Sequence, residues 1–304
     1  RAKGMNSLVF DLRENTGGKF DQALLLANEF LNKGDLIVYM EGKHRPRQDF
    51  HADGTGKLKD IALYILIDEG SASSSEIFAG AMQDNDRATI LGRRSYGKGL
   101  VQEPVYFNDG SGIRLTVARF YSPTGRCIQK PYGEDYRYDI IERYRHGEMM
   151  VADSIKINDS LRYETPKGKV VYGGGGIVPD IFVPIDTAGV TKFMIDGNRK
   201  SLIVKYSIKL ADIYRAQLRE IKTVEQLDAL LNKMNLEKGY LEYAAANGVV
   251  PAPGEWEKSE FVVITQLKGL MGRNTQLDDD AFYPYILKID NAMYPITGKP
   301  IQRN

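Results

Sequence analysis

The stretch Ala62-Leu63-Tyr64-Ile65-Leu66-Ile67 is continuously apolar, and Gly70-Ser71-Ala72-Ser73-Ser74-Ser75-Glu76 follows two residues later. A short apolar run of this kind is typical of a strand that is covered on both faces of its sheet. Serines followed by a glutamate suit the first turn of a helix, and apolar residues then recur at helical spacing to Met82. The sequence therefore predicts a strand, a sharp turn and a helix over 73–85, with Ser73 at the turn.

The surrounding sequence repeats this alternation of strand and helix. A helix is predicted over 20–31, and a polar loop or hairpin over 43–58. Further strands are predicted at 7–12, 36–40, 89–94, 101–107 and 113–121. Alternation of this kind is typical of an α/β layered domain.

The second half of the chain changes character. Residues 130–172 are rich in Tyr, Arg, Asp and Glu and form an excursion, after which 173–184 return to the core. From residue 190 the apolar spacing is helical. It predicts a long helix over 202–218, a second near 227–234, and two more over 256–271 and 279–292. We therefore expect a core domain of residues 1–189 and a small α-helical domain of residues 190–304.

Composition excludes several functional classes. Lys plus Arg (41) nearly balance Asp plus Glu (40), so no strong field would attract nucleic acid or an anionic membrane. The single cysteine, Cys127, excludes an internal disulfide framework and a cysteine-based metal cluster. Apolar runs are too short to span a bilayer. The chain opens at Arg1 without Met and reaches a strand by Leu8, so we expect the C-terminal part of a longer protein whose targeting segment has been removed.

Ser73 at a strand-to-helix turn is a candidate nucleophile, and a serine hydroxyl needs a base to take its proton. The three histidines, His44, His51 and His146, lie in polar segments and form no metal-binding spacing, so zinc hydrolysis is not expected. Lysine is the alternative base, but it acts only when neutral, and burial favours the neutral form. Lys98 is the lysine best placed for burial, because Gly97 and Gly99 flank it and Leu100 follows.

Two further features fit an acyl-transfer site. Gln102, four residues after Lys98, carries an amide that could orient a lysine amine without adding charge. An oxyanion needs hydrogen-bond donors, which the backbone N–H of Ser74 at the helix start and the Gly17-Gly18 turn could supply. Taken alone, these features are better explained as a surface glutamine, a helix cap and a tight turn.

As a set, these residues resemble the C-terminal processing, or tail-specific, serine protease family. The resemblance covers residues 4–130 and 173–184. It rests on Asp11-Leu12-Arg13-Glu14-Asn15-Thr16-Gly17-Gly18, Gly70-Ser71-Ala72-Ser73-Ser74-Ser75-Glu76-Ile77, Gln83-Asp84-Asn85, Gly97-Lys98-Gly99, Val101-Gln102, Leu115-Thr116-Val117-Ala118-Arg119-Phe120-Tyr121-Ser122-Pro123-Thr124-Gly125-Arg126 and Gly176-Ile177-Val178-Pro179-Asp180. It implies a ClpP/crotonase-like spiral core of strands and helices, followed here by the helical domain.

The resemblance also implies roles for single residues. Ser73 would be the nucleophile, Lys98 the general base and Gln102 the residue that orients the lysine. Asp84 and Glu76 fall at the family's supporting acidic positions. The implied activity is cleavage of proteins near unstructured C-terminal tails through an acyl-enzyme, without metal or cofactor. Family members are usually exported to the bacterial cell envelope or periplasm, and a homo-oligomer is compatible with the family.

The chain departs from the family pattern in three ways. Ser74 replaces a more usual alanine, a change expected to keep the backbone donor. We also expect the PDZ domain that usually precedes the core, and the strands that normally precede Leu8, to lie outside this sequence. The main alternative is a non-catalytic binding or scaffold module that retains the protease-like core. A crotonase-like acyl-CoA enzyme is a weaker third interpretation, because no basic pocket for nucleotide phosphates is evident.

Overall fold

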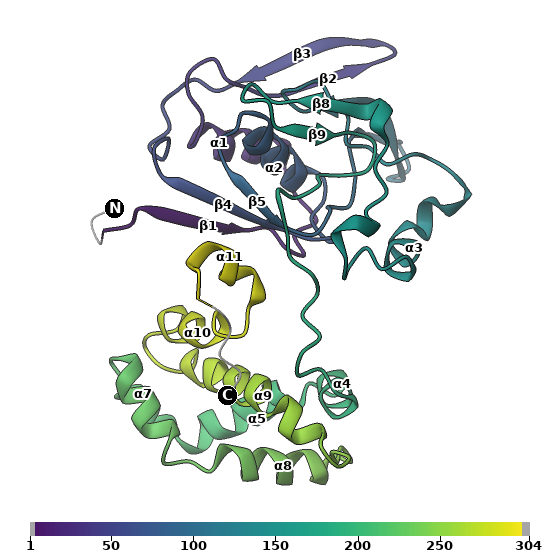
Figure 1. Cartoon of the computed structure of the whole chain (residues 1–304). Helices are drawn as coiled ribbons and strands as arrows, with labels where there is room; N and C mark the ends of the chain where they lie inside the picture. Colours follow the sequence, from purple (N-terminus) through teal and green to yellow (C-terminus); the bar gives the residue numbers. More distant parts are fainter. Residues whose placement is uncertain (1–3, 300–304) are drawn as a thin grey trace. The chain divides into compact units, whose positions relative to one another are not determined.

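The computed structural model describes residues 4–299. The chain divides into two compact units, residues 1–185 and 186–304, and each is described here by itself. The first unit contains two four-stranded sheets, a two-stranded sheet and several helices (Figure 1), and the described part of the second unit contains helices without strands. The predicted order of an α/β core and a helical region is confirmed.

A parallel sheet forms the centre of the first unit. Its four strands have the order β1 (Ser7–Asp11), β4 (Ala62–Ile67), β5 (Thr89–Gly92) and β10 (Ile181–Phe182). In register, Phe10 lies opposite Ile65, and Ile65 lies opposite Ile90. Ile65 and Ile90 are fully buried, as expected for strands covered on both faces.

Two helices complete the core of this unit. Helix α1 (Phe20–Asn28) packs on α2 (Ser74–Asp84), and α2 also contacts β2 and β5. The rings of Phe10 and Phe30 lie 5.1 Å and 5.8 Å from that of Phe78, which is buried on α2. This aromatic cluster anchors α2 and therefore fixes the position of its first turn.

The second sheet is antiparallel. Its strand order is β3 (Arg45–His51), β2 (Leu36–Gly42), β7 (Gly112–Tyr121) and β6 (Leu100–Tyr106). The polar segment predicted as a loop or hairpin contains β3, which pairs with β2. Strand β6 lies at an edge of the sheet, and its pairing with β7 is interrupted by a register shift between Val101 and Gln102.

The excursion after residue 130 contains short helices and a small two-stranded sheet. It contains the short helices η1 (Glu134–Arg137) and α3 (Asp139–Arg145) and the single turns η2 (Ala152–Ser154) and η3 (Asp159–Leu161). A two-stranded ribbon of β8 (Arg162–Glu164) and β9 (Val170–Tyr172) follows, and the chain then returns to the parallel sheet at β10.

The second unit is built around the 18-residue helix α9 (Glu255–Gly272). Its centre is aromatic: the ring of Phe193 lies 5.9 Å from Trp256 and 6.2 Å from Tyr240. The remaining helices are α4 (Lys192–Arg199), α5 (Leu202–Ile213), α6 (Arg215–Arg219), α7 (Val224–Leu231), α8 (Leu236–Ala246), α10 (Asp279–Ile286), η4 (Asn291–Met293) and α11 (Tyr294–Thr297). In the described part of the chain, no helix is both long and apolar enough to cross a membrane.

Several helix boundaries in this unit differ from the prediction. The single helix expected over 202–218 is divided at Tyr214, whose ψ of 19° is not helical. The second predicted helix ends early, at Leu231, and Asn235 begins α8 because its side chain accepts from the Lys238 N–H. The prediction also missed α4 and α8, and the helix expected over 279–292 ends at Ile286.

Candidate active site

Three loops meet at the carboxyl edge of the parallel sheet. They follow β1, β4 and β5, and parallel strands bring their carboxyl ends to one edge. The Ala72 N–H donates to the Asn15 carbonyl at 3.0 Å, which joins the first loop to the second. The Tyr96 N–H donates to the Ser71 carbonyl at 2.9 Å, which joins the third loop to the second. This edge therefore collects Gly17, Ser73 and Lys98 from distant parts of the sequence.

Ser73 occupies a strained position at the start of α2. Its backbone has φ +59° and ψ −120°, a conformation that residues other than glycine rarely adopt. The turn after β1 lies directly against it. A Cβ at Gly17 would lie 2.6 Å from the Ala72 carbonyl oxygen and 2.9 Å from the Ser73 Cβ, so this position requires glycine. The close approach holds the strained serine between the turn and the helix.

The neighbouring serines fasten this turn to the helix. The Ser71 hydroxyl donates to the Leu12 carbonyl at 2.7 Å, and the Ser75 hydroxyl donates to the Asn15 carbonyl at 3.0 Å. The Ser74 hydroxyl accepts from the Gly18 N–H at 2.5 Å. By contrast, the Ser73 hydroxyl donates to no acceptor within residues 4–299. Ser71, Ser74 and Ser75 thus stabilise the turn, whereas Ser73 lines a pocket.

The Glu76 carboxylate connects Ser73 to the loop after β5 that carries Lys98, called here the lysine loop. Its Oε2 accepts from the backbone N–H groups of Ser73 and Lys98, each at 2.9 Å. Its Oε1 accepts from the Ser95 hydroxyl at 2.5 Å and the Gly97 N–H at 2.7 Å. Burial raises the pKa of Glu76, and the four hydrogen bonds oppose that rise. Sequence motifs placed Glu76 in a supporting position, and this geometry is consistent with one.

A pocket of about 380 Å³ lies at this edge. Ser73, Lys98 and Gln102 all line it, as do Gly18 and Ser74. No hydrogen bond joins Ser73 to Lys98 among the described residues. The Gln102 side chain is exposed and donates to the Thr116 hydroxyl at 3.3 Å rather than contacting the lysine amine. Catalytic hydrogen bonds are often long or unformed until a substrate binds, so this arrangement is compatible with a resting site.

The three predicted oxyanion donors differ in availability. The Ser74 N–H, at the first position of α2, has no protein acceptor in the described part of the chain. The Gly17 N–H donates to the Asn15 Oδ1 at 2.9 Å, and the Gly18 N–H donates to the Ser74 hydroxyl. From the sequence, the replacement of alanine by Ser74 is expected to keep the backbone donor of residue 74. The sequence does not reveal that the added hydroxyl accepts the hydrogen bond of the Gly18 N–H.

Asp84 lies away from the pocket, at the other end of α2. An 11-residue helix is about 16 Å long. The carboxylate is fully buried and pairs with Arg126 at 2.7 Å. It also accepts from the hydroxyls of Thr124, at 2.7 Å, and Ser122. Asp84 therefore secures the turn that follows β7 against α2, and any effect on chemistry would be indirect.

Buried charges behind the lysine loop had no sequence signal. The Arg143 guanidinium, on α3, donates to the carbonyls of Arg94 at 2.5 Å and Ser95 at 3.0 Å. Glu148 binds Arg143 at 2.8 Å and Arg94 at 2.7 Å. The weakly patterned excursion therefore braces the segment that leads to Lys98.

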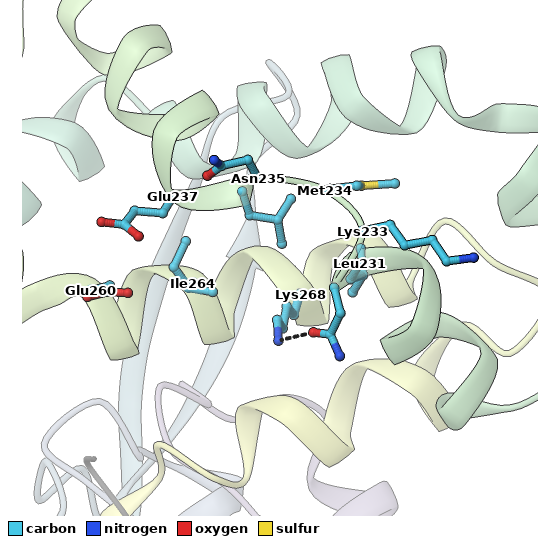
Figure 2. Close-up of a pocket in the computed structure, with 10 residues that line it drawn as sticks. Leu231, Lys233, Met234, Asn235, Glu237, Glu260, Ile264 and Lys268 are labelled. Atoms are coloured by element: carbon cyan, nitrogen blue, oxygen red, sulfur yellow. Dashed lines mark hydrogen bonds between the residues drawn. The ribbon is translucent and has the colours of Figure 1, made fainter.

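The histidines lie outside the pocket of Ser73, and a hollow in the helical unit lacks a nucleophile. His44, His51 and His146 are exposed, and none of them lines the pocket of Ser73. A second hollow of about 400 Å³ lies in the helical unit, where Lys268 donates to Asn232 at 3.5 Å (Figure 2). Its lining contains no serine or cysteine nucleophile. Within residues 4–299, no cluster of three His, Cys, Asp or Glu side chains could hold a metal ion.

Comparison with known proteins agrees with the motifs. The family model for peptidase family S41 matches residues 1–138, and a family of unknown function, DUF8443, matches residues 193–276. A probable CtpA-like serine protease of Staphylococcus epidermidis is 38% identical over 139 residues, which cover 45% of this chain and 28% of the relative. The equivalent protein of Staphylococcus saprophyticus is 39% identical over 126 residues, covering 41% of this chain and 26% of the relative.

Among solved structures, the photosystem II D1 C-terminal processing protease aligns with a TM-score of 0.43 and 28% identity, covering 60% of this chain and 36% of that one. The chain spans less than a third of the length of the first curated relatives that it matches. The family model and the curated relatives bear out the resemblance predicted from the motifs. Residues 1–138 of this chain match the family model of peptidase family S41, and their sequence is similar to that of CtpA-like serine proteases.

Proposed function

We propose that this chain carries the catalytic centre of a serine endopeptidase in which Ser73 is the nucleophile and Lys98 the general base. The observation that carries the proposal is the shared pocket: both side chains line it, and Glu76 holds both backbones. The match to the family model of peptidase family S41 and the similarity to CtpA-like serine proteases support the reaction class.

The proposed chemistry follows the arrangement of the pocket. The neutral Lys98 amine takes the proton of the Ser73 hydroxyl, whose oxygen attacks the scissile carbonyl carbon. The oxyanion of the tetrahedral intermediate accepts from the Ser74 N–H and, once it is released from the Ser74 hydroxyl, from the Gly18 N–H. The lysine then gives its proton to the leaving amine, and water hydrolyses the acyl-enzyme. Gln102 turns toward the lysine amine when substrate fills the pocket.

The proposal extends to substrate and setting. The motif resemblance supports protein substrates cut near unstructured C-terminal tails, and a location in the bacterial cell envelope or periplasm. It also allows a homo-oligomer. The name of one similar protein, the photosystem II D1 C-terminal processing protease, refers to the processing of a C-terminus. For this chain, C-terminal processing is proposed from the motifs alone. Proteomic comparison of substrate C-termini in cells with and without the protein would test this part.

A fluorophosphonate probe tests the catalytic core of the proposal. The probe should label the protein at Ser73, and Ser73→Ala should abolish labelling and proteolysis while leaving the thermal midpoint close to that of the wild type. Ser111, in the exposed turn between β6 and β7, provides a matched serine control, and Ser111→Ala should label normally. Full proteolysis by the Ser73→Ala protein would contradict the assignment. A correctly folded protein that neither labels nor cleaves would favour the non-catalytic binding module.

A further inference from the structure

The pocket of Ser73 has an unusual distribution of charge. Much of its wall is apolar, and it is lined by Phe20, Met40, Ile77, Leu100, Val101, Pro104 and Phe120. Two cationic residues, Lys98 and Arg114, also line it, and no aspartate or glutamate does. A concave site with this lining favours an anionic group on whatever enters it.

Arg114 is directed to the pocket by strand geometry. It lies on β7 opposite Pro104 of β6, while Thr116 lies opposite Gln102. Side chains at alternate positions of a strand share one face, so Arg114 and Thr116 share the face on which Gln102 and Pro104 line the pocket. The arginine therefore stands beside the residue proposed to orient the lysine.

The Arg114 guanidinium has no counter-ion in the described part of the chain. Glu103, next to Pro104 on β6, instead pairs with Arg45 at 2.6 Å. The two pocket cations also differ in chemistry. A lysine that serves as the base must spend part of the cycle neutral, whereas a guanidinium stays charged at all working pH values. Arg114 is thus the permanent positive charge of the pocket, with all its donors available.

We propose that Arg114 is a specificity residue that binds a carboxylate of the substrate polypeptide close to the scissile bond. This inference rests on the proposed endopeptidase function. The planar guanidinium matches a carboxylate with two parallel hydrogen bonds, which fixes position as well as charge. The carboxylate is an aspartate or glutamate side chain or the terminal carboxylate of the substrate, and these sources share the same recognition chemistry.

Paired peptides test the proposal. Quenched fluorogenic peptides would be built on a cleavage site mapped in β-casein, with glutamate or glutamine placed in turn at each position within four residues of the cut. A second pair would differ only in a free or amidated C-terminus. We expect the wild-type kcat/KM to be about 5-fold higher for the carboxylate member of at least one pair. This ratio corresponds to roughly 1 kcal/mol, the free energy of an exposed ion pair.

Three variants of Arg114 and one control variant test whether Arg114 causes the preference for the carboxylate peptide. Arg114→Gln should remove the preference, and Arg114→Lys should retain part of it, because a point charge remains without the planar fork. Arg114→Glu should reverse the preference, so that a peptide with lysine at the same position is cleaved faster than the glutamate peptide. Arg119, also exposed on β7 but absent from the pocket lining, is the matched control, and Arg119→Gln should keep the wild-type preference.

A binding arm separates this proposal from the proposed function. Fluorescence anisotropy with labelled glutamate and glutamine peptides would compare Ser73→Ala with the Ser73→Ala, Arg114→Gln double variant, which needs no cleavage. Tighter binding of the carboxylate peptide that disappears in the double variant would support Arg114 recognition even if Ser73 proved not to be the nucleophile. The proposal would be overturned if both members of every peptide pair bound equally and had equal kcat/KM, in the wild type as in Arg114→Gln.

Discussion

The backbone N–H groups of Ser73 and Lys98 donate to the same oxygen, Oε2 of Glu76, at 2.9 Å each. The two residues are 25 positions apart in the sequence and follow different strands of the parallel sheet. A single buried acceptor thus fixes the start of α2 relative to the lysine loop. Pre-organisation of this kind reduces the ordering required when a substrate arrives.

Glu76→Gln tests this link. The substituted amide nitrogen carries hydrogens, so two of the four donors around Glu76 would face another donor instead of an acceptor. Each unsatisfied buried donor costs about 1–3 kcal/mol, so the free energy of unfolding should fall by about 2–6 kcal/mol. Urea denaturation measures the loss, and Glu103→Gln, on the exposed part of β6, is a control that should cost less than about 1 kcal/mol. An unchanged denaturation midpoint for Glu76→Gln would show that the shared acceptor does not stabilise the fold.

Ser74→Ala tests the availability of the second oxyanion donor. The Ser74 hydroxyl accepts from the Gly18 N–H at 2.5 Å, so a substrate oxyanion must displace it. Its removal leaves that N–H free for the transition state, and we expect kcat to rise by about 3- to 10-fold, below the 100-fold or more that a whole donor contributes. Steady-state kinetics on a quenched peptide measures the change. Ser74→Thr retains a hydroxyl and should behave as the wild type, whereas a lower kcat in a stable Ser74→Ala protein would mean that the hydroxyl itself assists the reaction.

Arg143→Met tests the brace behind the lysine loop. Arg143 donates to the Arg94 and Ser95 carbonyls and pairs with Glu148, and both charged side chains are buried. Loss of one member of a buried ion pair costs about 3–5 kcal/mol, and the loop that carries Lys98 should loosen. We expect kcat to fall while KM changes little, because Arg143 does not line the pocket.

Two comparisons distinguish positioning from general instability. Arg143→Lys restores a charge for Glu148, so it should recover part of the kcat. Arg273→Met, which breaks an exposed pair with Asp279 in the helical unit, should leave kcat unchanged. A kcat for Arg143→Met equal to the wild-type value, measured below its thermal midpoint, would remove any role of the excursion in the site.

The sequence identified the elements of the site better than their contacts. Ser73 and Lys98 could be predicted because strand ends and helix starts have local signals, and parallel strands bring their carboxyl ends together. The Ser74–Gly18 and Arg143–Ser95 hydrogen bonds could not be, because they depend on side chains that meet across 56 and 48 residues. The structural role of Asp84 could not be predicted for the same reason, because its buried partner Arg126 lies far from it in the sequence.

The identity of the base can be tested by pH. A base accepts a proton only in its unprotonated form, so the limiting kcat should rise with increasing pH and then stay high. Lys98→Ala should reduce kcat about as much as Ser73→Ala, because nucleophile and base act as a unit. Lys98→Arg should not restore activity, since a guanidinium cannot give up its proton at working pH.

Histidine is the competing base, and its exclusion completes the test. His51 and His146 bond to backbone carbonyls at 3.0 Å and 2.8 Å, and neither they nor His44 line the pocket of Ser73. A variant with all three histidines replaced by glutamine should therefore keep the wild-type kcat and the same ascending limb in its pH profile. Loss of activity in that variant, with circular dichroism and thermal midpoint unchanged, would assign the base to a histidine and exclude the Ser73–Lys98 pair.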